Sequence, residues 1–303
     1  MPRSSPSFAH SMEFSLMRLS RFSLLAALLL GAVGCKEADL APVVAKIPPL
    51  AFVRYINAVP DTLNTTVRWI DKVEFTPQTF TNVPFRGMGQ GGYQGLEAGA
   101  RTLRVFTYDP NLNSSTNGLG AETKQLTELT HTFEAGKYYT LLHLGYARTG
   151  STPAQRVLVI EDQLPAASTS VSIRAIHAGL GIANVDLHAT ATTTTTLVGS
   201  TPAFANVGLT NGTTGISAYA SRATGAFAIQ AAAAGTTTSL VAAAAPAGVA
   251  GTTTADPIAG ATVAGSVMTA IAFPATVTGS RAAAFATPGI VFYLDRQPPR
   301  TTP

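Results

Sequence analysis

The pentapeptide Arg54-Tyr55-Ile56-Asn57-Ala58 recurs later in the chain as Arg174-Ala175-Ile176-His177-Ala178. Two further segments return in the same order: Phe80-Thr81-Asn82-Val83 as Phe204-Ala205-Asn206-Val207, and Ile160-Glu161-Asp162-Gln163-Leu164-Pro165, more loosely, as Tyr293-Leu294-Asp295-Arg296-Gln297-Pro298. The spacing between the copies grows along the chain, which is expected when two homologous domains differ by insertions in their loops. The sequence therefore predicts two domains, residues 51–165 and residues 166–303.

Short alternating segments surround these repeats. In the first half they are residues 52–56, 67–70, 102–108, 138–144 and 156–160, each bounded by Gly, Pro, Asn or Asp. This pattern is typical of strands, and only residues 122–129 carry a weak helical periodicity. Strands at such spacing predict an all-β protein built as sandwiches or barrels.

Composition narrows the class of protein. The chain has 303 residues, of which 46% are hydrophobic and 12% charged, with a formal net charge of +4 and one cysteine. The apolar content is ample for a core, and a single cysteine excludes a disulfide framework within the chain. Part of the positive charge, from Arg3, Arg18 and Arg21, lies in the N-terminal 34 residues. No basic cluster interleaved with aromatic residues follows, so nucleic-acid binding is not expected.

The N-terminus has the features of a targeting signal. Arg18 and Arg21 precede an apolar run, residues 24–30, which small residues and Cys35 follow. This order predicts a secretory signal peptide over residues 1–34. The small residues before Cys35 resemble the lipobox of bacterial lipoproteins, which implies cleavage before Cys35 and lipid attachment to its sulfur. The alternative is an ordinary signal peptide followed by a structural cysteine.

A tether is expected after the anchor. Residues 35–50 contain three prolines and no periodic pattern, which indicates an extended linker to the first domain. Lys36 follows the lipidated cysteine, where lipoproteins retained at the inner membrane of some bacteria have Asp; outer-membrane delivery is therefore expected, facing either the periplasm or the outside. The start codon stays open between Met1, Met12 and Met17, because a leader beginning at Met17 is already complete.

The repeats also carry a family resemblance. Arg54-x-Ile56-x-Ala58, Leu96-Glu97-Ala98-Gly99 before a strand, and Phe133-Glu134-Ala135-Gly136-Lys137-Tyr138-Tyr139-Thr140 resemble the domain of unknown function DUF4397. The resemblance implies small immunoglobulin-like antiparallel β-sandwiches, often in tandem on secreted or lipid-anchored bacterial proteins, with no established enzymatic activity. It covers the first copy well. The Ala/Thr-rich second copy has lost the Ala-Gly-x-Tyr-Tyr-Thr element and is assigned through the repeat.

Two loops of the first domain are candidate ligand contacts. Residues 87–92 match G-x-G-x-x-G by letter, but no helix follows to place backbone N–H groups on a phosphate, so an inter-strand loop is expected. The candidate ligand contacts in this loop are Gly87, Gly89 and Gly92, together with Tyr93, which follows it directly. The second loop contributes Asp109, Asn111 and Asn113, which alternate like calcium ligands but lack the glycine and glutamate of an EF-hand. An Asx-rich turn is the alternative.

Catalytic groups are sparse. His177, Asp186 and His188 are the candidates for a metal site, because two histidines and a carboxylate can hold a transition metal. If Val67 matches Val185, the first copy has Arg68 and Ile70 instead, so exposed polar residues on a strand face are the alternative. The chain has no Gly-x-Ser-x-Gly elbow and no His-Glu-x-x-His motif. We expect no enzyme activity, no metal and no cofactor.

Three functions therefore stay open. The first is a lipid-anchored binding or structural module of the cell envelope, attached to the membrane through Cys35 and contacting an unidentified envelope protein or glycan through its loops. The second is carbohydrate or cell-wall binding, for which Trp69, Tyr93, Tyr108 and Tyr146 would supply a stacking platform. The third is a metal-dependent enzyme.

Overall fold

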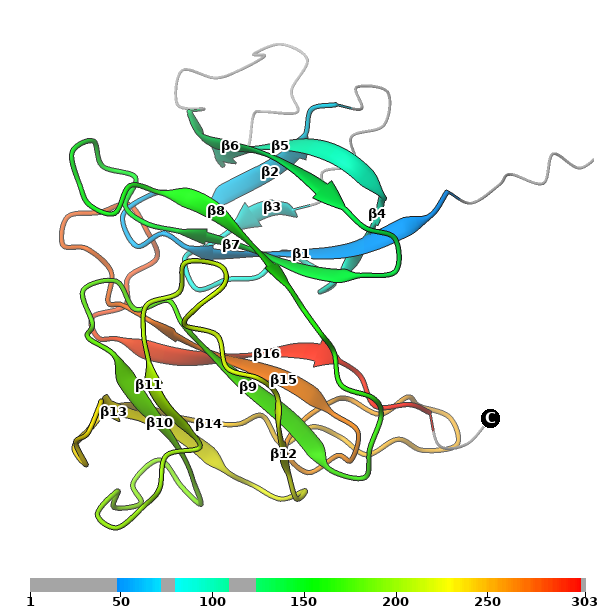
Figure 1. The fold of residues 1–303 in the computed structure, drawn as a ribbon, viewed down its shortest axis with the longest axis vertical. Helices are drawn as coiled ribbons and strands as arrows, with labels where there is room; N and C mark the ends of the chain where they lie inside the picture. The colour runs from blue at the N-terminus through cyan, green and yellow to red at the C-terminus, as the bar shows by residue number, and fades with distance from the viewer. Residues whose placement is uncertain (1–47, 72–79, 109–123, 301–303) are drawn as a thin grey trace, which may run out of the picture. The chain divides into compact units, whose positions relative to one another are not determined.

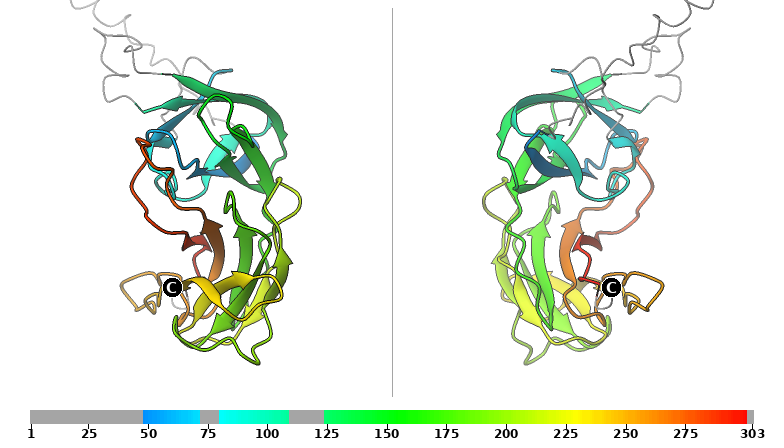
Figure 2. Two further views of the ribbon diagram at one scale, coloured as in Figure 1. Left: turned by 90° about the vertical axis from the view of Figure 1, so that its left-hand side faces the viewer. Right: turned by 90° about the vertical axis from the view of Figure 1, so that its right-hand side faces the viewer.

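The computed structural model describes residues 48–71, 80–108 and 124–300. Within these ranges the chain forms strands and turns without a helix, and no helix there is long and apolar enough to cross a membrane. The all-β prediction is confirmed: four four-stranded sheets form two sandwich-like units (Figures 1 and 2). Residues 125–129 of the weakly helical stretch lie instead in a strand, because the partner strand offers a long ladder of backbone hydrogen bonds, and residues 122 and 123 lie outside the described ranges.

The first sandwich contains eight strands: β1 (Leu50–Ala58), β2 (Thr65–Trp69), β3 (Phe80–Val83), β4 (Gln94–Glu97), β5 (Gly99–Thr107), β6 (Gln125–Phe133), β7 (Tyr138–Leu144) and β8 (Arg156–Glu161). One sheet has the order β4-β1-β7-β8 and the facing sheet the order β3-β2-β5-β6. The second sandwich also has eight strands: β9 (Val171–His177), β10 (Val185–Thr190), β11 (Phe204–Val207), β12 (Ala220–Arg222), β13 (Ala228–Ala233), β14 (Ser239–Ala244), β15 (Val267–Phe273) and β16 (Gly289–Arg296).

Both sandwiches have the same topology. The second pair of sheets has the orders β12-β9-β15-β16 and β11-β10-β13-β14, so each strand of the first sandwich has a counterpart eight strands later. The pairing is antiparallel except between β1 and β7 and between β9 and β15, which are parallel. The expected antiparallel sandwiches therefore each contain one parallel pair. A parallel pair needs a long crossover, and the strands of the facing sheet supply it.

Strand pairing fixes which residues correspond. Arg54 pairs with Thr140 across β1 and β7, and Arg174 pairs with Thr269 across β9 and β15. In the facing sheets Val67 pairs with Phe80, and Leu187 pairs with Phe204. Leu187, and not Val185, is therefore the counterpart of Val67. Leu187 follows Val67 by 120 residues, the same spacing that relates Arg174 to Arg54, and a bulge occurs at the same place in both copies.

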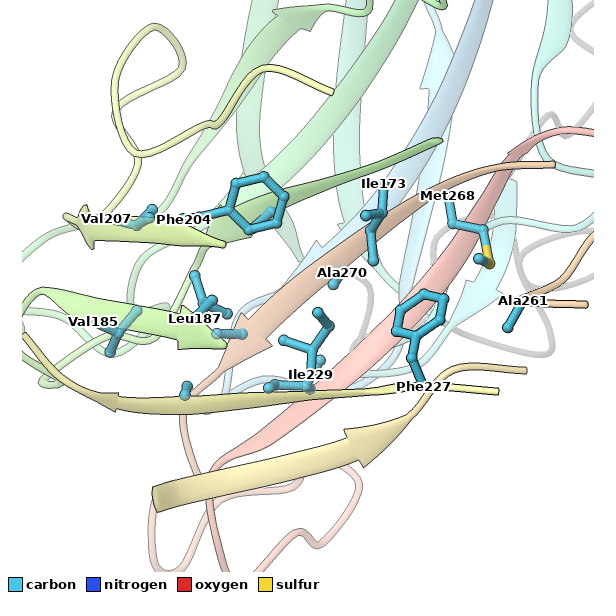
Figure 3. Packing of buried hydrophobic residues seen from close by; sticks show 14 of the residues in the cluster. Ile173, Val185, Leu187, Phe204, Val207, Phe227, Ile229, Ala261, Met268 and Ala270 are labelled. Carbon is cyan, nitrogen blue, oxygen red and sulfur yellow. The ribbon is translucent and has the colours of Figure 1, made fainter. Parts of the chain in front are cut away.

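Each sandwich encloses its own apolar core. Inward residues of the first include Val53, Tyr55, Val67 and Leu141, all fully buried. The core of the second is built from smaller side chains around Phe204, Phe227, Ile229 and Met268 (Figure 3). Both cores follow from alternation, because every second residue of a strand points to the same face of its sheet.

A third apolar cluster joins the two sandwiches. The first sandwich contributes Ile56, Ala58, Phe85, Leu142, Leu144, Leu158 and Ile160; the second contributes Ile176, Ala178, Leu180, Ile271, Phe273 and Tyr293. Most of these side chains lie on the outer faces of β1, β7, β8, β9, β15 and β16, opposite the two inner cores. The central strands are therefore buried on both faces, which explains why β9 and β15 are buried throughout.

A buried polar cluster lies inside the first sandwich. The Tyr55 hydroxyl lies 2.8 Å from Nδ1 of His143, and Nε2 of His143 lies 2.9 Å from Oε1 of Gln155. The Gln155 amide nitrogen donates to the Leu126 carbonyl, so Oε1 accepts from the imidazole and Nδ1 accepts from the tyrosine. His143 is fully buried in its neutral form, and burial lowers its pKa to about 4.

This histidine predicts a loss of stability in acid. Because its pKa is lower in the folded than in the unfolded protein, unfolding takes up a proton below pH about 6.5. The stability it supports is complete above that pH and falls as the pH drops towards about 4. His143→Gln should flatten the dependence of the unfolding free energy on pH in this window, measured by urea unfolding. His131→Gln, at a partly exposed position, is the control and should leave most of the slope; an unchanged slope in His143→Gln would contradict the prediction.

Candidate functional site

Two arginines occupy corresponding positions on the faces through which the sandwiches meet. Arg54 on β1 is 0% exposed and Arg174 on β9 is 3% exposed. In each case the guanidinium Nε donates to the threonine on the neighbouring parallel strand, at 2.8 Å to Thr140 and 2.9 Å to Thr269. Alternation puts these arginines on the side of the sheet away from the inner core, so they need partners from outside their own sandwich.

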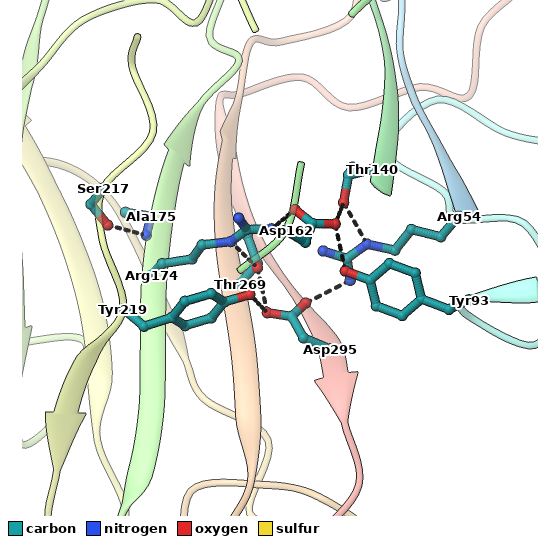
Figure 4. A network of polar contacts seen from close by, with 10 residues as sticks. All are labelled: Arg54, Tyr93, Thr140, Asp162, Arg174, Ala175, Ser217, Tyr219, Thr269 and Asp295. Atoms are coloured by element: carbon teal, nitrogen blue, oxygen red, sulfur yellow. Dashed lines mark hydrogen bonds and ion pairs between the residues drawn. The ribbon is translucent and has the colours of Figure 1, made fainter. Parts of the chain in front are cut away.

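Each arginine finds its carboxylate in the other sandwich. Arg54 Nη1 donates to Asp295 Oδ1 at 2.6 Å, and Arg174 Nη2 donates to Asp162 Oδ1 in a short contact (Figure 4). Asp162 follows β8 and Asp295 lies in β16, which are corresponding places. The two ion pairs therefore cross between the sandwiches in a pseudo-twofold arrangement, with each sandwich giving one cation and one anion.

The second carboxylate oxygens are held within the same sandwich. Asp162 Oδ2 accepts from Thr140 at 2.5 Å and from the Tyr93 hydroxyl at 2.6 Å. Asp295 Oδ2 accepts likewise from Thr269 at 2.6 Å and from the Tyr219 hydroxyl at 2.7 Å. The tyrosine rings also lie against the guanidinium groups: Arg54 is 4.7 Å from the Tyr93 ring centre, and Arg174 is 4.8 Å from that of Tyr219. We call these eight residues the crossed network.

Charge is balanced inside the crossed network. Burial alone would lower the pKa of Arg54, but the carboxylate of Asp295 reverses that effect and holds the pKa above its ordinary value. Arg174 behaves in the same way, with Asp162 as the main carboxylate. Burial raises the pKa of Tyr93 and of Tyr219, so both hydroxyls stay protonated and donate. With both aspartates saturated by donors, the network is suited to joining the sandwiches rather than to moving protons.

Arg86 makes a further contact between the sandwiches. Its Nη2 donates to the carbonyls of Pro274 at 2.5 Å and Thr287 at 2.6 Å, and its guanidinium lies 4.3 Å from the centre of the Phe285 ring. The Tyr293 hydroxyl donates back to the Arg86 carbonyl at 2.9 Å. The segment between β15 and β16 is thereby fixed to the first sandwich.

The metal candidates do not converge. Asp186 accepts backbone N–H groups of Asn206 at 2.6 Å and Gly235 at 2.8 Å, which lowers its pKa. Nδ1 of His188 lies 3.1 Å from the Ser200 hydroxyl. Nδ1 of His177 accepts the Gly179 N–H, and Nε2 lies 3.0 Å from the Ala183 carbonyl. Across residues 48–71, 80–108 and 124–300, no three His, Cys, Asp or Glu side chains form a metal-binding group.

These residues also correct the expectation of exposed strand-face positions. Asp186 is 8% exposed and His188 is 2% exposed. With the corrected register, Asp186 corresponds to Thr66, whose hydroxyl accepts the N–H of Asn82. Asn82 and Asn206 both have a positive φ, at 55° and 49°. Asp186 therefore caps the left-handed residue of a bulge, a structural duty that the first sandwich gives to a threonine.

The glycine-rich loop is packed more deeply than a free contact loop. Gly89 donates its N–H to the Tyr55 carbonyl and is buried, and a Cβ there would lie 2.2 Å from the Phe80 ring. A Cβ on Gly87 would meet Pro84 at 2.7 Å. Tyr93 belongs to the crossed network, whereas Gly92, with φ 70°, is open around its Cα. Close packing explains the two inner glycines, and ligand contact stays a prediction for the outer edge of the loop.

Other predicted site residues lie outside the described part of the chain. They are the lipidation site Cys35 and the loop residues Asp109, Asn111 and Asn113. Sequence reasoning found both members of the arginine and aspartate pairs as repeats but assigned them no role. It missed Tyr219 and the part played by both threonines. The available signal for a buried role was the arginine that stands in both copies of a largely apolar strand, Arg54 and Arg174.

Breaking one crossed pair should unfold the protein more easily. Arg54→Met leaves Asp295 buried without its cation and should lower the free energy of unfolding by about 3–5 kcal/mol. Adding Asp295→Leu removes the stranded charge and should recover much of that loss, measured by urea unfolding. The control is Arg104→Met, which breaks a half-exposed pair with Glu128 and should cost less than about 1 kcal/mol. Equal losses in Arg54→Met and Arg104→Met would contradict the role of the crossed network.

Comparison with known proteins finds a family match in the first part of the described chain. The search among curated proteins found no match. The sequence model described as Domain of unknown function (DUF4397) matches residues 51–188, from β1 through β10. The match thus contains Arg54, Tyr93, Thr140, Asp162 and Arg174 of the crossed network. Over residues 51–188 the chain carries a DUF4397 domain, which confirms the resemblance predicted from its sequence motifs.

Proposed function

We propose that the chain is a lipid-anchored, non-catalytic module of the bacterial cell envelope that binds or braces a partner as one rigid body. The observation that carries the proposal is the crossed network: two buried ion pairs and a shared apolar cluster join the sandwiches. The arginines, aspartates and tyrosines of the crossed network belong to residue types that can take part in catalysis, but here they join the two sandwiches. Such a body presents loops at fixed positions, which suits recognition or bracing.

Duplication supports a structural role. The two sandwiches share strand order, the bulge with its left-handed asparagine, and corresponding residues at every position of the crossed network. We infer that the second sandwich is a diverged copy of the first. The copies pair through the same face, as the subunits of a homodimer do across a twofold axis. Covalent linkage makes that pairing independent of protein concentration.

The anchor part of the proposal comes from the sequence. Cys35, preceded by an apolar run and small residues, supplies one thiol for lipid attachment, and the residues between Cys35 and β1 would give the body distance from the membrane. Two or three acyl chains hold a protein firmly, at about 0.8 kcal/mol for each buried CH₂. Lys36 favours the outer membrane. The partner would be an envelope protein or a glycan.

A carbohydrate platform made of the four predicted aromatic residues has less support. Trp69 is 5% exposed and packs edge-on against Phe133 in the first core. Tyr93 is held in the crossed network, which leaves Tyr108 and Tyr146 partly exposed. Stacking on a sugar requires an accessible ring face. Glycan binding is therefore a second candidate function only through these two tyrosines and the loops.

Removal of the predicted anchor should release the protein from membranes. Cys35→Ala should move the protein from the membrane fraction to the soluble fraction of the envelope, because no acyl chain can attach. Mass spectrometry of wild type should find a diacylated or triacylated N-terminal peptide that begins at Cys35. The sequence has no second cysteine that could serve as a matched control. Ser168→Ala, a similar small change at an exposed position, is therefore the control for expression. A Cys35→Ala protein that still sediments with membranes would contradict the anchor.

Loop contact is tested separately. Replacement of residues 109–120 by a short Gly-Ser linker should leave the cooperative unfolding unchanged and reduce partner capture after crosslinking in intact envelopes. Residues 87–95 are left intact, because Gly89 and Tyr93 support the fold. Undiminished capture would move the contact surface to the sheet edges or the second sandwich, and turnover of a substrate would overturn the non-catalytic proposal.

A further inference from the structure

The second sandwich contains an apolar cavity near one end of its core. Its volume is about 380 Å³, and its lining includes His177, Ile182, Val185, Val241, Ala272 and Pro288. Val185 and Ala272 are 1% and 3% exposed, so the inner wall is buried. Leu240, which also lines the cavity, is 53% exposed. The cavity therefore extends from the interior of the sandwich to the surface beside β14.

The corresponding space in the first sandwich is filled. The strand registers match Ala175 to Tyr55, Ala272 to His143 and Pro288 to Gln155. In the first sandwich these three large polar residues form the hydrogen-bonded cluster around His143. In the second sandwich, two alanines and a proline take their places. The same scaffold thus has a plug in one copy and a cavity in the other.

The exchange changes chemistry as well as volume. Thr65, which hydrogen-bonds the Tyr55 hydroxyl in the first sandwich, corresponds to Val185 in the second. Every polar member of the plug is therefore replaced by an apolar residue. Apolar cavities stay dry and accept apolar molecules, and an engineered cavity of about 150 Å³ in another protein binds benzene.

His177 is the polar side chain in the wall, and its ring nitrogens are already engaged. Nδ1 accepts the Gly179 N–H at 3.0 Å, and Nε2 therefore carries the proton and donates to the Ala183 carbonyl at 3.0 Å. Burial lowers its pKa, so the ring is neutral at pH 7. It offers a ligand an aromatic surface, without a charge or a free hydrogen-bonding atom.

We propose that this cavity is a binding site for a small, uncharged, apolar molecule with the bulk of two or three aromatic rings or an equivalent aliphatic chain. The apolar wall favours hydrocarbon surface, and the neutral histidine supplies no counter-ion for an acid. Leu240 and Gly181 lie where the ligand would enter. The site lies within the second sandwich and does not depend on the anchor or on a protein partner.

Binding is tested with a matched pair of fluorescent probes on the purified two-sandwich protein. N-phenyl-1-naphthylamine is uncharged, whereas 8-anilinonaphthalene-1-sulfonate carries a sulfonate on nearly the same ring system. The uncharged probe should bind at one site with enhanced fluorescence, and the sulfonate at least about tenfold more weakly, because the lining has no cation. Equal binding of both probes would overturn the proposed ligand class.

Filling the cavity should remove the site. Ala272→Leu should lower the affinity for the uncharged probe by at least about tenfold while the midpoint of thermal unfolding is kept or raised. Ala205→Leu makes the same change at an exposed position of β11 and should leave binding unaltered. A folded Ala272→Leu protein with wild-type affinity would overturn the proposal.

A measurement on the wild type covers the case in which Ala272→Leu does not fold. Methyl NMR spectra recorded during titration with the uncharged probe should show shifts of the methyl groups of Ile182, Val185 and Val241. The methyl groups of Val53 and Val67, in the filled core of the first sandwich, are the internal reference and should not move. The proposed site would be overturned if only the methyl groups of the first sandwich shifted, or if no methyl group of either set shifted.

Discussion

Arg54 and Arg174 lie on sheet faces that an isolated sandwich would expose, and each guanidinium is neutralised by a carboxylate of the other sandwich. A buried arginine without an anion is costly, so neither sandwich can present this face without the other in place. The ion pairs alone add little net stability, because removing both partners from water offsets their attraction. Their geometry fixes how the sandwiches meet, and the apolar cluster around them supplies the hydrophobic stabilisation.

The interface and the interiors have diverged to different degrees. Residues of the crossed network correspond one to one between the copies, down to the tyrosine ring that covers each arginine. The interiors differ, with a hydrogen-bonded plug around His143 in one and an apolar cavity beside Ala272 in the other. A charge buried at an interface tolerates few substitutions because its partner is left unpaired, whereas a polar cluster in a core can be replaced by apolar residues when all of its members change together. The second interior thus has an apolar cavity where the first has its hydrogen-bonded cluster.

The surfaces that join the two sandwiches differ from the surfaces that stay accessible to other molecules. The outer faces of the central strands are consumed by contact between the sandwiches, so the surfaces left for other molecules are loops, outer sheets and the cavity mouth beside Leu240. A shared apolar cluster and two buried ion pairs oppose bending between the sandwiches, unlike a flexible linker between separate domains. Under the proposed lipid anchor, such a joint would keep the presented surfaces in one relative orientation.

The amino-acid sequence by itself determined the all-β class, several strands of the first half and the pairs of repeated segments, because period-two alternation and short repeats are local signals. It also brought out Arg54 with Arg174 and Asp162 with Asp295 as corresponding positions. Only the tertiary structure decided that the pairs cross, since two sheets far apart in sequence must meet before Arg54 can reach Asp295. The same holds for Tyr93, which stands in a glycine-rich loop, and for the burial of Asp186 and His188 as structural residues. The cavity was hidden because Ala175 and Ala272 resemble the Ala-rich composition around them, and their meaning depends on the large residues that fill the same space in the first sandwich.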